Sequence, residues 1–127
     1  MPDQPPLEGL RTLVLEDEYF VAADLKRILQ EVGAHPVVLS GSIDDALANL
    51  RAASFDFALL DINIRGEMAF LVADESRRRK VPFAFVSGYC GAAIPPRFAG
   101  VPNWGKPYDD RQIVVGIQAL RGRTPTM

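Results

Sequence analysis

Short apolar segments that alternate with amphipathic helical segments are the feature that most constrains the fold of this chain. Five runs of mainly apolar residues are expected to be strands, at 11–15, 35–39, 55–60, 81–86 and 101–104. The third and fourth runs are apolar almost throughout, which is typical of strands whose two faces are both covered by helices. Strands that alternate with helices form a parallel sheet, so the sequence predicts an α/β fold.

Helical periodicity fills most of the gaps between these strands. Helices are expected at 18–32, 42–50, 67–79 and 109–120. Ser42, with Asp45 three residues later, resembles a capping box, and Asp109 is placed to cap the last helix. Gly33 is a favourable stop for the first helix, and a loop is expected at 62–66.

The alternation is imperfect between residues 88 and 100. This segment contains three glycines and two prolines and has no helical period. A loop with at most one short turn is therefore expected where a fourth helix would belong.

Acidic residues stand at the ends of two expected strands. Glu16 and Asp17 follow the first strand, and Asp61 follows the third. A carboxylate at the end of an apolar strand is costly unless a cation or a phosphoryl group lies beside it. Ligands of open parallel sheets bind beyond the carboxyl ends of the strands. These acids are therefore expected to meet there with Ser87, which ends the fourth strand, and Lys106, which follows the fifth.

The side chains expected at this edge suit magnesium binding and phosphoryl transfer. Mg²⁺ prefers oxygen ligands and keeps several waters. Asp17 and Asp61 are expected to bind it directly, Glu16 through a water, and Asn63 through its backbone carbonyl. A carboxylate can also act as a nucleophile and form an aspartyl phosphate. The metal, the lysine and the serine hydroxyl would then bind the three phosphoryl oxygens.

One ordered set of residues resembles the site of a response-regulator receiver domain. Its members are Glu16-Asp17, Asp61, Ser87 and Lys106-Pro107. The resemblance implies that Asp61 is the phosphoacceptor, which takes a phosphoryl group from the phosphohistidine of a histidine kinase. It also implies that Glu16 and Asp17 hold the metal, that Ser87 is the switch hydroxyl, and that Lys106 binds the phosphoryl group.

The same resemblance implies a particular fold. It is a doubly wound, flavodoxin-like sheet of five parallel strands in the order 2-1-3-4-5, with an irregular or shortened fourth helix. One domain is expected over residues 1–127, with a core from about residue 11 to residue 121. The family also suggests a cis Lys106–Pro107 peptide, which would aim the lysine into the site.

Two further segments narrow the resemblance. Asp61 to Glu67, and Phe85-Val86-Ser87-Gly88-Tyr89, are similar to a receiver subfamily with a Phe-x-Thr/Ser-Gly-Tyr motif. Members of that subfamily are common beside histidine kinases of the HWE and HisKA2 classes. Many receivers carry a switch Phe or Tyr three residues before the lysine. Asn103 holds that position here, which leaves Trp104 and Tyr89 as alternative switch aromatics.

The expected function is that of a two-component phosphorylation switch or a phosphorelay or phosphate-sink protein. Its expected partners are a histidine kinase or a histidine phosphotransfer protein, and a downstream protein that reads the phosphorylated surface. The segment at 88–100 is expected to be mobile in the free protein and to become ordered on phosphorylation. A monomer or a weak homodimer is expected.

Two other classes of protein are alternatives, and each needs residues that this sequence lacks. A small Mg²⁺-dependent aspartyl-phosphate phosphatase or phosphotransferase would need a second acid just after the nucleophile, where Asn63 stands. A mononucleotide or flavin-binding module would need a Gly-rich loop after the first strand, where Glu16-Asp17-Glu18 has the wrong charge. The expectation is therefore a protein without metabolic enzyme activity.

Composition limits the remaining possibilities. The chain has 127 residues and a net charge of -2, which gives no electrostatic reason to expect nucleic acid or a membrane surface as partner. Its single cysteine, Cys90, excludes an intrachain disulfide, and no apolar run approaches membrane-spanning length. A cytoplasmic protein is expected. His35 is interpreted as a structural or surface residue, because no His/Cys cluster suited to zinc accompanies it.

Overall fold

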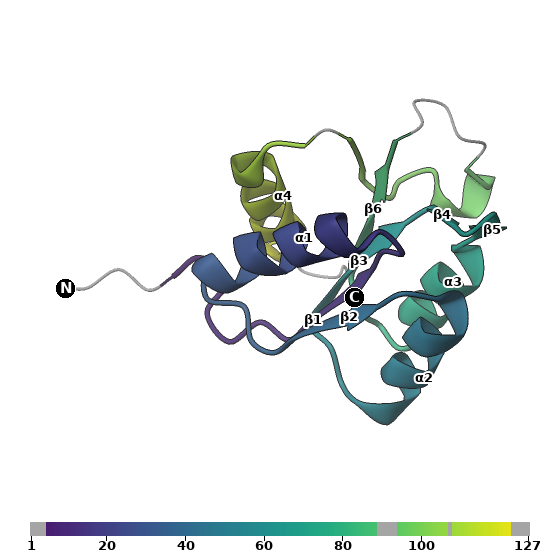
Figure 1. Ribbon diagram of the computed structural model, residues 1–127, viewed down its shortest axis with the longest axis horizontal. Coiled ribbons are helices and arrows are strands. Elements are labelled where there is room, and N and C mark those ends of the chain that lie inside the picture. Colours follow the sequence, from purple (N-terminus) through teal and green to yellow (C-terminus); the bar gives the residue numbers. More distant parts are fainter. Residues whose placement is uncertain (1–4, 89–93, 107, 123–127) are drawn as a thin grey trace.

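A parallel sheet of five strands lies at the centre of the computed structural model, which describes residues 5–88, 94–106 and 108–122 (Figure 1). The strands are β1 (Thr12–Leu15), β2 (Val37–Ser40), β3 (Phe57–Asp61), β6 (Phe83–Ser87) and β7 (Asn103–Gly105). Their order across the sheet is β2-β1-β3-β6-β7, and every pairing between them is parallel. This is the 2-1-3-4-5 order expected from the sequence, so the predicted flavodoxin-like fold is confirmed.

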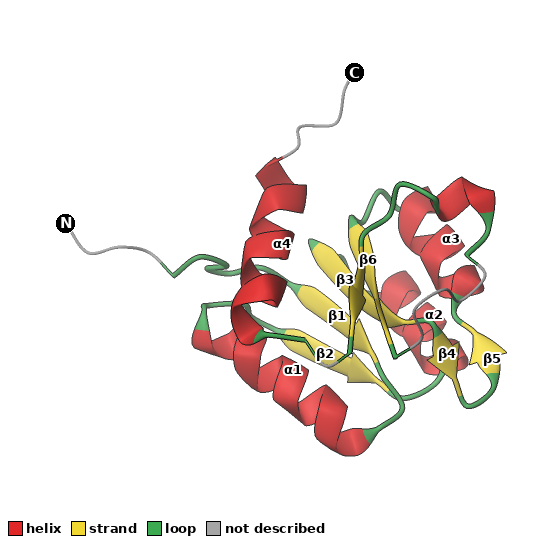
Figure 2. Cartoon of the chain, turned by 90° about the horizontal axis from the view of Figure 1, so that it is seen from above, coloured by secondary structure: helices red, strands yellow, loops and turns green. Residues whose placement is uncertain are grey.

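Helices cover both faces of the sheet (Figure 2). They are α1 (Tyr19–Glu31), α2 (Ile43–Ala52), α3 (Phe70–Arg78) and α4 (Asp110–Gly122). Helices α1 and α4 pack on one face, and α2 and α3 pack on the other. Both expected caps are present. The Asp45 amide donates to Ser42 Oγ over 3.1 Å, and the Arg111 amide donates to Asp109 Oδ1 over 3.1 Å.

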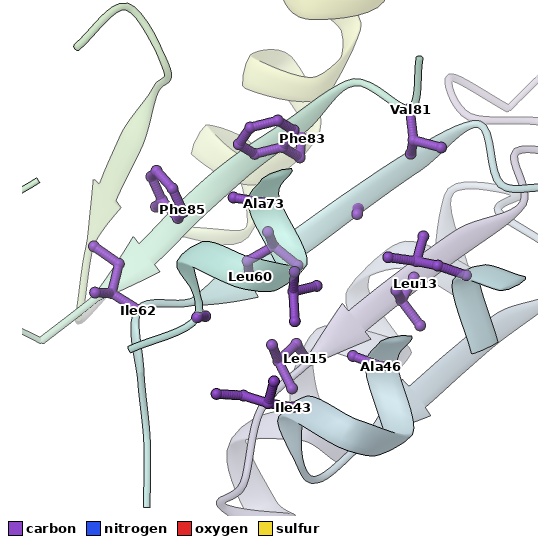
Figure 3. Packing of buried hydrophobic residues seen from close by; sticks show 14 of the residues in the cluster. Leu13, Leu15, Ile43, Ala46, Leu60, Ile62, Ala73, Val81, Phe83 and Phe85 are labelled. Atoms are coloured by element: carbon purple, nitrogen blue, oxygen red, sulfur yellow. The ribbon is translucent and has the colours of Figure 1, made fainter. Parts of the chain in front are cut away.

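Two apolar cores result, because successive strand residues point to opposite faces of the sheet. Leu13, Leu15 and Leu60 pack with the α2 and α3 side chains, as Figure 3 shows. Val14 and Leu59, their neighbours in sequence, pack instead against α1 and α4. Both faces of β1 and β3 are therefore buried, which explains why these strands are apolar almost throughout.

The segment before β1 also belongs to the core. Leu7 and Leu10 are 1% and 2% exposed and pack in the cluster formed by α1 and α4. The segment is tied to the end of α1, because the Leu7 amide donates to the Val32 carbonyl over 2.8 Å. Gly33 permits this close approach, because a Cβ there would lie 2.9 Å from the Glu8 Cα. Burial thus begins before residue 11, where the sequence placed the start of the core.

A β-hairpin follows Asp61 where the sequence predicted a loop at 62–66 and a helix beginning at Glu67. Strands β4 (Asn63–Ile64) and β5 (Glu67–Met68) pair antiparallel. The turn between them places both Arg65 and Gly66 at positive φ, 52° and 86°. Two such residues make the kind of turn that closes a two-residue hairpin. The prediction for this segment was wrong, and α3 begins at Phe70 instead.

The segment between β6 and β7 has no regular helix in its described part, as expected. It contains only a 3₁₀ turn, η1 (Pro96–Phe98), while residues 89–93, with Tyr89 and Cys90, lie outside the described residues. Phe98 is fully buried and stacks on Phe70 with a 5.8 Å centroid distance. Arg97 makes two 2.9 Å bonds to Asp74 of α3. Burial of Phe98 contributes about 2–3 kcal/mol, whereas solvent screens the exposed ion pair, which therefore adds little. Aromatic packing is therefore the main anchor of η1.

Trp104 of β7 is half-buried and packs with the α1–α4 core. Its indole ring lies against α4 at Gly116, where an added Cβ would come within 2.8 Å of Cε2. Asn103, at the place of the usual switch aromatic, is exposed.

We predict that Gly116→Ala destabilises the protein. A glycine-to-alanine change inside a helix normally stabilises it by roughly 0.5–1 kcal/mol. Here the methyl group overlaps the Trp104 ring, and such overpacking costs about 1–3 kcal/mol. Urea unfolding should show the loss, and a second change, Trp104→Leu, should restore part of it. A Gly116→Ala protein more stable than the parent would show that Trp104 does not pack there.

Candidate functional site

The sheet register brings the predicted site residues to one edge. Leu15 of β1 lies beside Leu60 of β3, so Glu16 and Asp61 follow at the same level. Ser87 of β6 pairs with Gly105 of β7. Lys106 comes next in the chain, and its amide donates to the Ser87 carbonyl over 2.9 Å. The carboxyl ends of four strands therefore place an acid pair, an acid, a serine and a lysine together, as the sequence predicted.

Three carboxylates form a cluster at this edge. Glu16, Asp17 and Asp61 each offer an oxygen atom within 4.8 Å of the others. Glu16 and Asp61 are buried, at 3% and 8% exposure, and Asp17 is half-buried. Like charges this close repel each other, so the cluster requires compensating cations or hydrogen-bond donors.

Backbone amides supply part of that compensation. The Glu18 amide donates to Glu16 Oε2 over 3.1 Å, and the Arg65 amide donates to Asp17 Oδ2 over 3.2 Å. The Asn63 amide lies 3.4 Å from Asp61 Oδ1. Each acid is therefore held by an amide of the β1–α1 loop or of the β4–β5 hairpin.

Lys106 supplies the balancing positive charge. Its Nζ lies 2.8 Å from Glu16 Oε1 and 3.1 Å from Asp61 Oδ2. Two carboxylates contact this ammonium group and that of Asp17 lies beside them, so the cluster keeps a negative charge.

The acid–lysine contact changes the pKa of both partners. Burial raises the pKa of Glu16 to about 7, although the hydrogen bond from Lys106 opposes the rise. Burial alone would lower the pKa of Lys106, but Glu16 and Asp61 outweigh that effect and the pKa is raised. The ammonium form of Lys106 is thus favoured.

A pocket of about 350 Å³ opens above Asp61. Its walls come from the β1–α1 loop, the β4–β5 hairpin, Gly88 and Lys106. Asn63 lies in the wall of this pocket, and its Oδ1 accepts a hydrogen bond from the Gly66 amide over 2.9 Å. Metal binding by the backbone carbonyl of Asn63 stays a prediction.

Arg65 is a lining residue that was not predicted from the sequence. Arg65 is exposed at the tip of the hairpin and also lines the pocket. The hairpin itself was not predicted, so nothing in the pattern placed this arginine beside Asp61. The expected cis Lys106–Pro107 peptide involves Pro107, which lies outside the described residues.

The donor set fits a hard divalent cation. Among the described residues, this cluster consists of the carboxylates of Glu16, Asp17 and Asp61 alone, and Mg²⁺ binds oxygen ligands of this kind. Their surplus negative charge over Lys106 is what a dication would offset. The residues present are thus compatible with Mg²⁺.

No family model matches the chain. The transcriptional regulatory protein TcrA of Mycobacterium tuberculosis is 29% identical over 124 residues, which is 94% of this chain and 49% of TcrA. The chain thus spans about half the length of the curated relatives it matches.

Solved structures give a similar result. SdrG from Sphingomonas melonis Fr1 is 30% identical, with a TM-score of 0.78 over 91% of this chain and 97% of SdrG. SdrG in its BeF3-activated conformation matches at 29% identity, with a TM-score of 0.76 over 90% of this chain and 98% of that one. A CheY-like response regulator receiver domain from Methylobacillus flagellatus shares the fold, at 20% identity and a TM-score of 0.76, over 87% of this chain and 98% of that one.

The fold and the edge of acids define a flavodoxin-like α/β domain with an acidic, lysine-bridged pocket. This chain belongs to the response-regulator receiver family of two-component signalling. Within the described residues, the helices are all too short or too polar to cross a bilayer.

We predict that Glu16→Gln stabilises the metal-free protein at pH 8. Burial raises the pKa of Glu16 from 4.5 to about 7, so at pH 8 the folded protein holds an unfavourable carboxylate. Because the folded-state pKa is the higher one, the folded protein binds more protons between these two pH values. Its stability falls as pH rises through that window. Removing the charge should raise Tm by about 2–5 °C at pH 8, and the gain should shrink toward pH 5.

Thermal melts with EDTA measure this, and Glu8→Gln, at an exposed position before β1, is the matched control. Added Mg²⁺ should raise the Tm of the parent more than that of Glu16→Gln. A variant that melts below the parent at pH 8 without metal would contradict the role given to charge crowding.

Proposed function

We propose that the chain accepts a phosphoryl group on Asp61 and acts as a stand-alone phosphorylation switch, or as a phosphorelay or phosphate-sink protein. The observation that carries this proposal is the position of Asp61. Its carboxylate is buried at the base of a pocket, 3.1 Å from the Lys106 ammonium and beside two other acids. A nucleophile, a cation and a set of metal ligands thus share one site.

The phosphoryl donor is a phosphohistidine of a kinase or of a histidine phosphotransfer protein. A carboxylate oxygen of Asp61 attacks phosphorus, the new O–P bond forms, and the P–N bond to the imidazole breaks. The departing imidazole nitrogen takes a proton. The product is an acyl phosphate on Asp61, and water can later hydrolyse it to inorganic phosphate. The protein mainly positions these groups and stabilises their charge.

Lys106 and Ser87 act on the transferred group. Lys106 is already bonded to Asp61, so its ammonium needs only to turn from Oδ2 to a phosphoryl oxygen. Its amide is bonded to the Ser87 carbonyl, so the lysine and the serine move as neighbours. The Ser87 hydroxyl would donate a hydrogen bond to a second phosphoryl oxygen.

Glu16, Asp17 and Asp61 would hold Mg²⁺, with the Asn63 carbonyl as a further proposed ligand. The metal would supply positive charge to the phosphoryl oxygens. The protein's own contribution is to keep these ligands in place. The amides of Glu18, Asn63 and Arg65 do so by bonding to the carboxylates.

The surface around the pocket suits a protein donor. Tyr19 and Phe20 follow the acid cluster at the start of α1 and are 75% and 84% exposed. Their rings touch edge to face, with centroids 5.4 Å apart. Exposed aromatic side chains are typical of protein interfaces. Receiver domains pair with histidine kinases, and the subfamily resemblance favours a kinase of the HWE or HisKA2 class.

An aspartyl-phosphate phosphatase is a weaker assignment. That chemistry uses a second acid two residues after the nucleophile, and Asn63 occupies this position. Under this proposal, the chain hydrolyses only the acyl phosphate on its own Asp61, and does so slowly.

We predict that Asp61 is the only phosphoacceptor. Phosphoramidate with Mg²⁺ should add one phosphoryl group to the protein, and trapping followed by peptide mass spectrometry should locate it at Asp61. Asp61→Asn should abolish the label, because an amide is not a nucleophile for this reaction. Asp44→Asn, an exposed position on α2, is the matched control and should be labelled as the parent is. Undiminished labelling of Asp61→Asn would refute the proposal.

We predict that Ser87 transmits the phosphorylated state to the segment before β7. Hydrogen exchange in peptides that cover 94–100 should slow when Asp61 is phosphorylated, because Ser87 is drawn toward the phosphoryl group. Ser87→Ala should still be labelled on Asp61 but should lose this protection. Equal protection in both proteins would show that the signal leaves by another route.

A further inference from the structure

The side chain of Arg65 lines the pocket, and the proposed mechanism uses only the backbone amide of this residue. It lies at the tip of the β4–β5 hairpin and lines the same pocket as Asp61 and Lys106. Its side chain is exposed. Among the described residues, no carboxylate forms an ion pair with its guanidinium.

The hairpin holds this arginine in place through two contacts. The Arg65 amide donates to Asp17 Oδ2 over 3.2 Å, and the neighbouring Gly66 amide donates to Asn63 Oδ1 over 2.9 Å. Ile64, the residue before Arg65, is 2% exposed and belongs to the α2–α3 core. The backbone that carries Arg65 is thus fixed against the acid cluster, while its side chain extends at the rim.

The charges around the pocket make the Arg65 guanidinium a suitable binding group for an anion. A phosphoryl donor is an anion, and the pocket wall presents Asp17, Glu18 and Asp61 to it. Lys106 is the other cation in the wall, and both Glu16 and Asp61 already engage it. An anion that enters the pocket therefore meets Lys106, which is already paired with carboxylates, and Arg65, which is not.

We propose that Arg65 binds the phosphoryl group of the incoming donor at the rim of the pocket and so determines how well phosphorylated donors engage Asp61. This inference rests on the proposed function. Arg65 takes no part in the bonds that form and break. Its planar guanidinium can give paired hydrogen bonds to phosphoryl oxygens.

Three variants at this position separate charge from backbone effects. Arg65 has a φ of 52°, which asparagine and glycine tolerate better than alanine. Arg65→Asn and Arg65→Gly therefore remove the cation with little change to the turn, and Arg65→Lys keeps it. Arg51→Ala, an exposed arginine near the end of α2, is the matched control.

The experiment measures labelling of Asp61 by phosphoramidate and binding of beryllofluoride, a phosphoryl mimic, both with saturating Mg²⁺. We expect Arg65→Asn and Arg65→Gly to label about three- to tenfold more slowly and to bind beryllofluoride more weakly by a similar factor. Arg65→Lys should recover much of both. The loss should shrink as salt rises from 50 to 500 mM, since salt screens an exposed charge. Mg²⁺ affinity, measured by calorimetry, should change little or increase.

Other results would overturn the inference. Labelling rates equal to the parent in Arg65→Asn and Arg65→Gly would show that the guanidinium does not meet the donor. A loss that Arg65→Lys does not repair, together with weakened Mg²⁺ binding, would assign Arg65 to holding Asp17. If the parent protein itself is never labelled on Asp61, the proposed function fails, and this inference fails with it. A labelled parent with unaffected variants refutes the role of Arg65 alone.

Discussion

The contact of Lys106 with Glu16 and Asp61 is the interaction on which the site depends. Two buried carboxylates this close to each other are tolerated only because an ammonium group lies between them. In the chain, Lys106 lies 90 positions after Glu16 and 45 positions after Asp61. Only the parallel register of β1, β3, β6 and β7 brings them together. The apolar cores on both faces of the sheet therefore have a second role, which is to hold this register against the repulsion of the acids.

The sequence was sufficient to predict this arrangement because its signals are strong and independent. Apolar runs predicted the strands, and parallel connectivity places all their carboxyl ends at one edge. The acids, the serine and the lysine each stand at such an end. Their convergence then followed from topology, without knowledge of any side-chain contact. The individual roles of Glu16, Asp17, Asn63, Ser87 and Lys106 remain proposals.

The parts that were not predicted depend on local backbone angles or on distant contacts. The hairpin after Asp61 requires Arg65 in a left-handed conformation, and an Arg-Gly pair is not a strong signal for such a turn. The N-terminal segment is rich in proline and polar residues, and only Leu7 and Leu10 show its burial. The glycine and proline content of 88–100 correctly excluded a regular helix from the described part of this segment, residues 94–100. It contained no sign that Phe98 would fill a space between Phe70, Phe83 and Phe85.

Helix α3 connects the two irregular segments that leave the site. The hairpin passes directly into α3, and the Ala69 amide there donates to the Ile62 carbonyl over 2.8 Å. The segment after Ser87 returns to the same helix through Phe98, which stacks on Phe70, and through Arg97, which bonds to Asp74. Under the proposed function, a phosphoryl group on Asp61 would act on the first segment through Asn63 and on the second through Ser87. Because both segments rest on α3, neither can shift far without disturbing the same aromatic contact. Phosphorylation of Asp61 would thus affect the hairpin and the segment before β7 together, through the packing of Phe70 against Phe98.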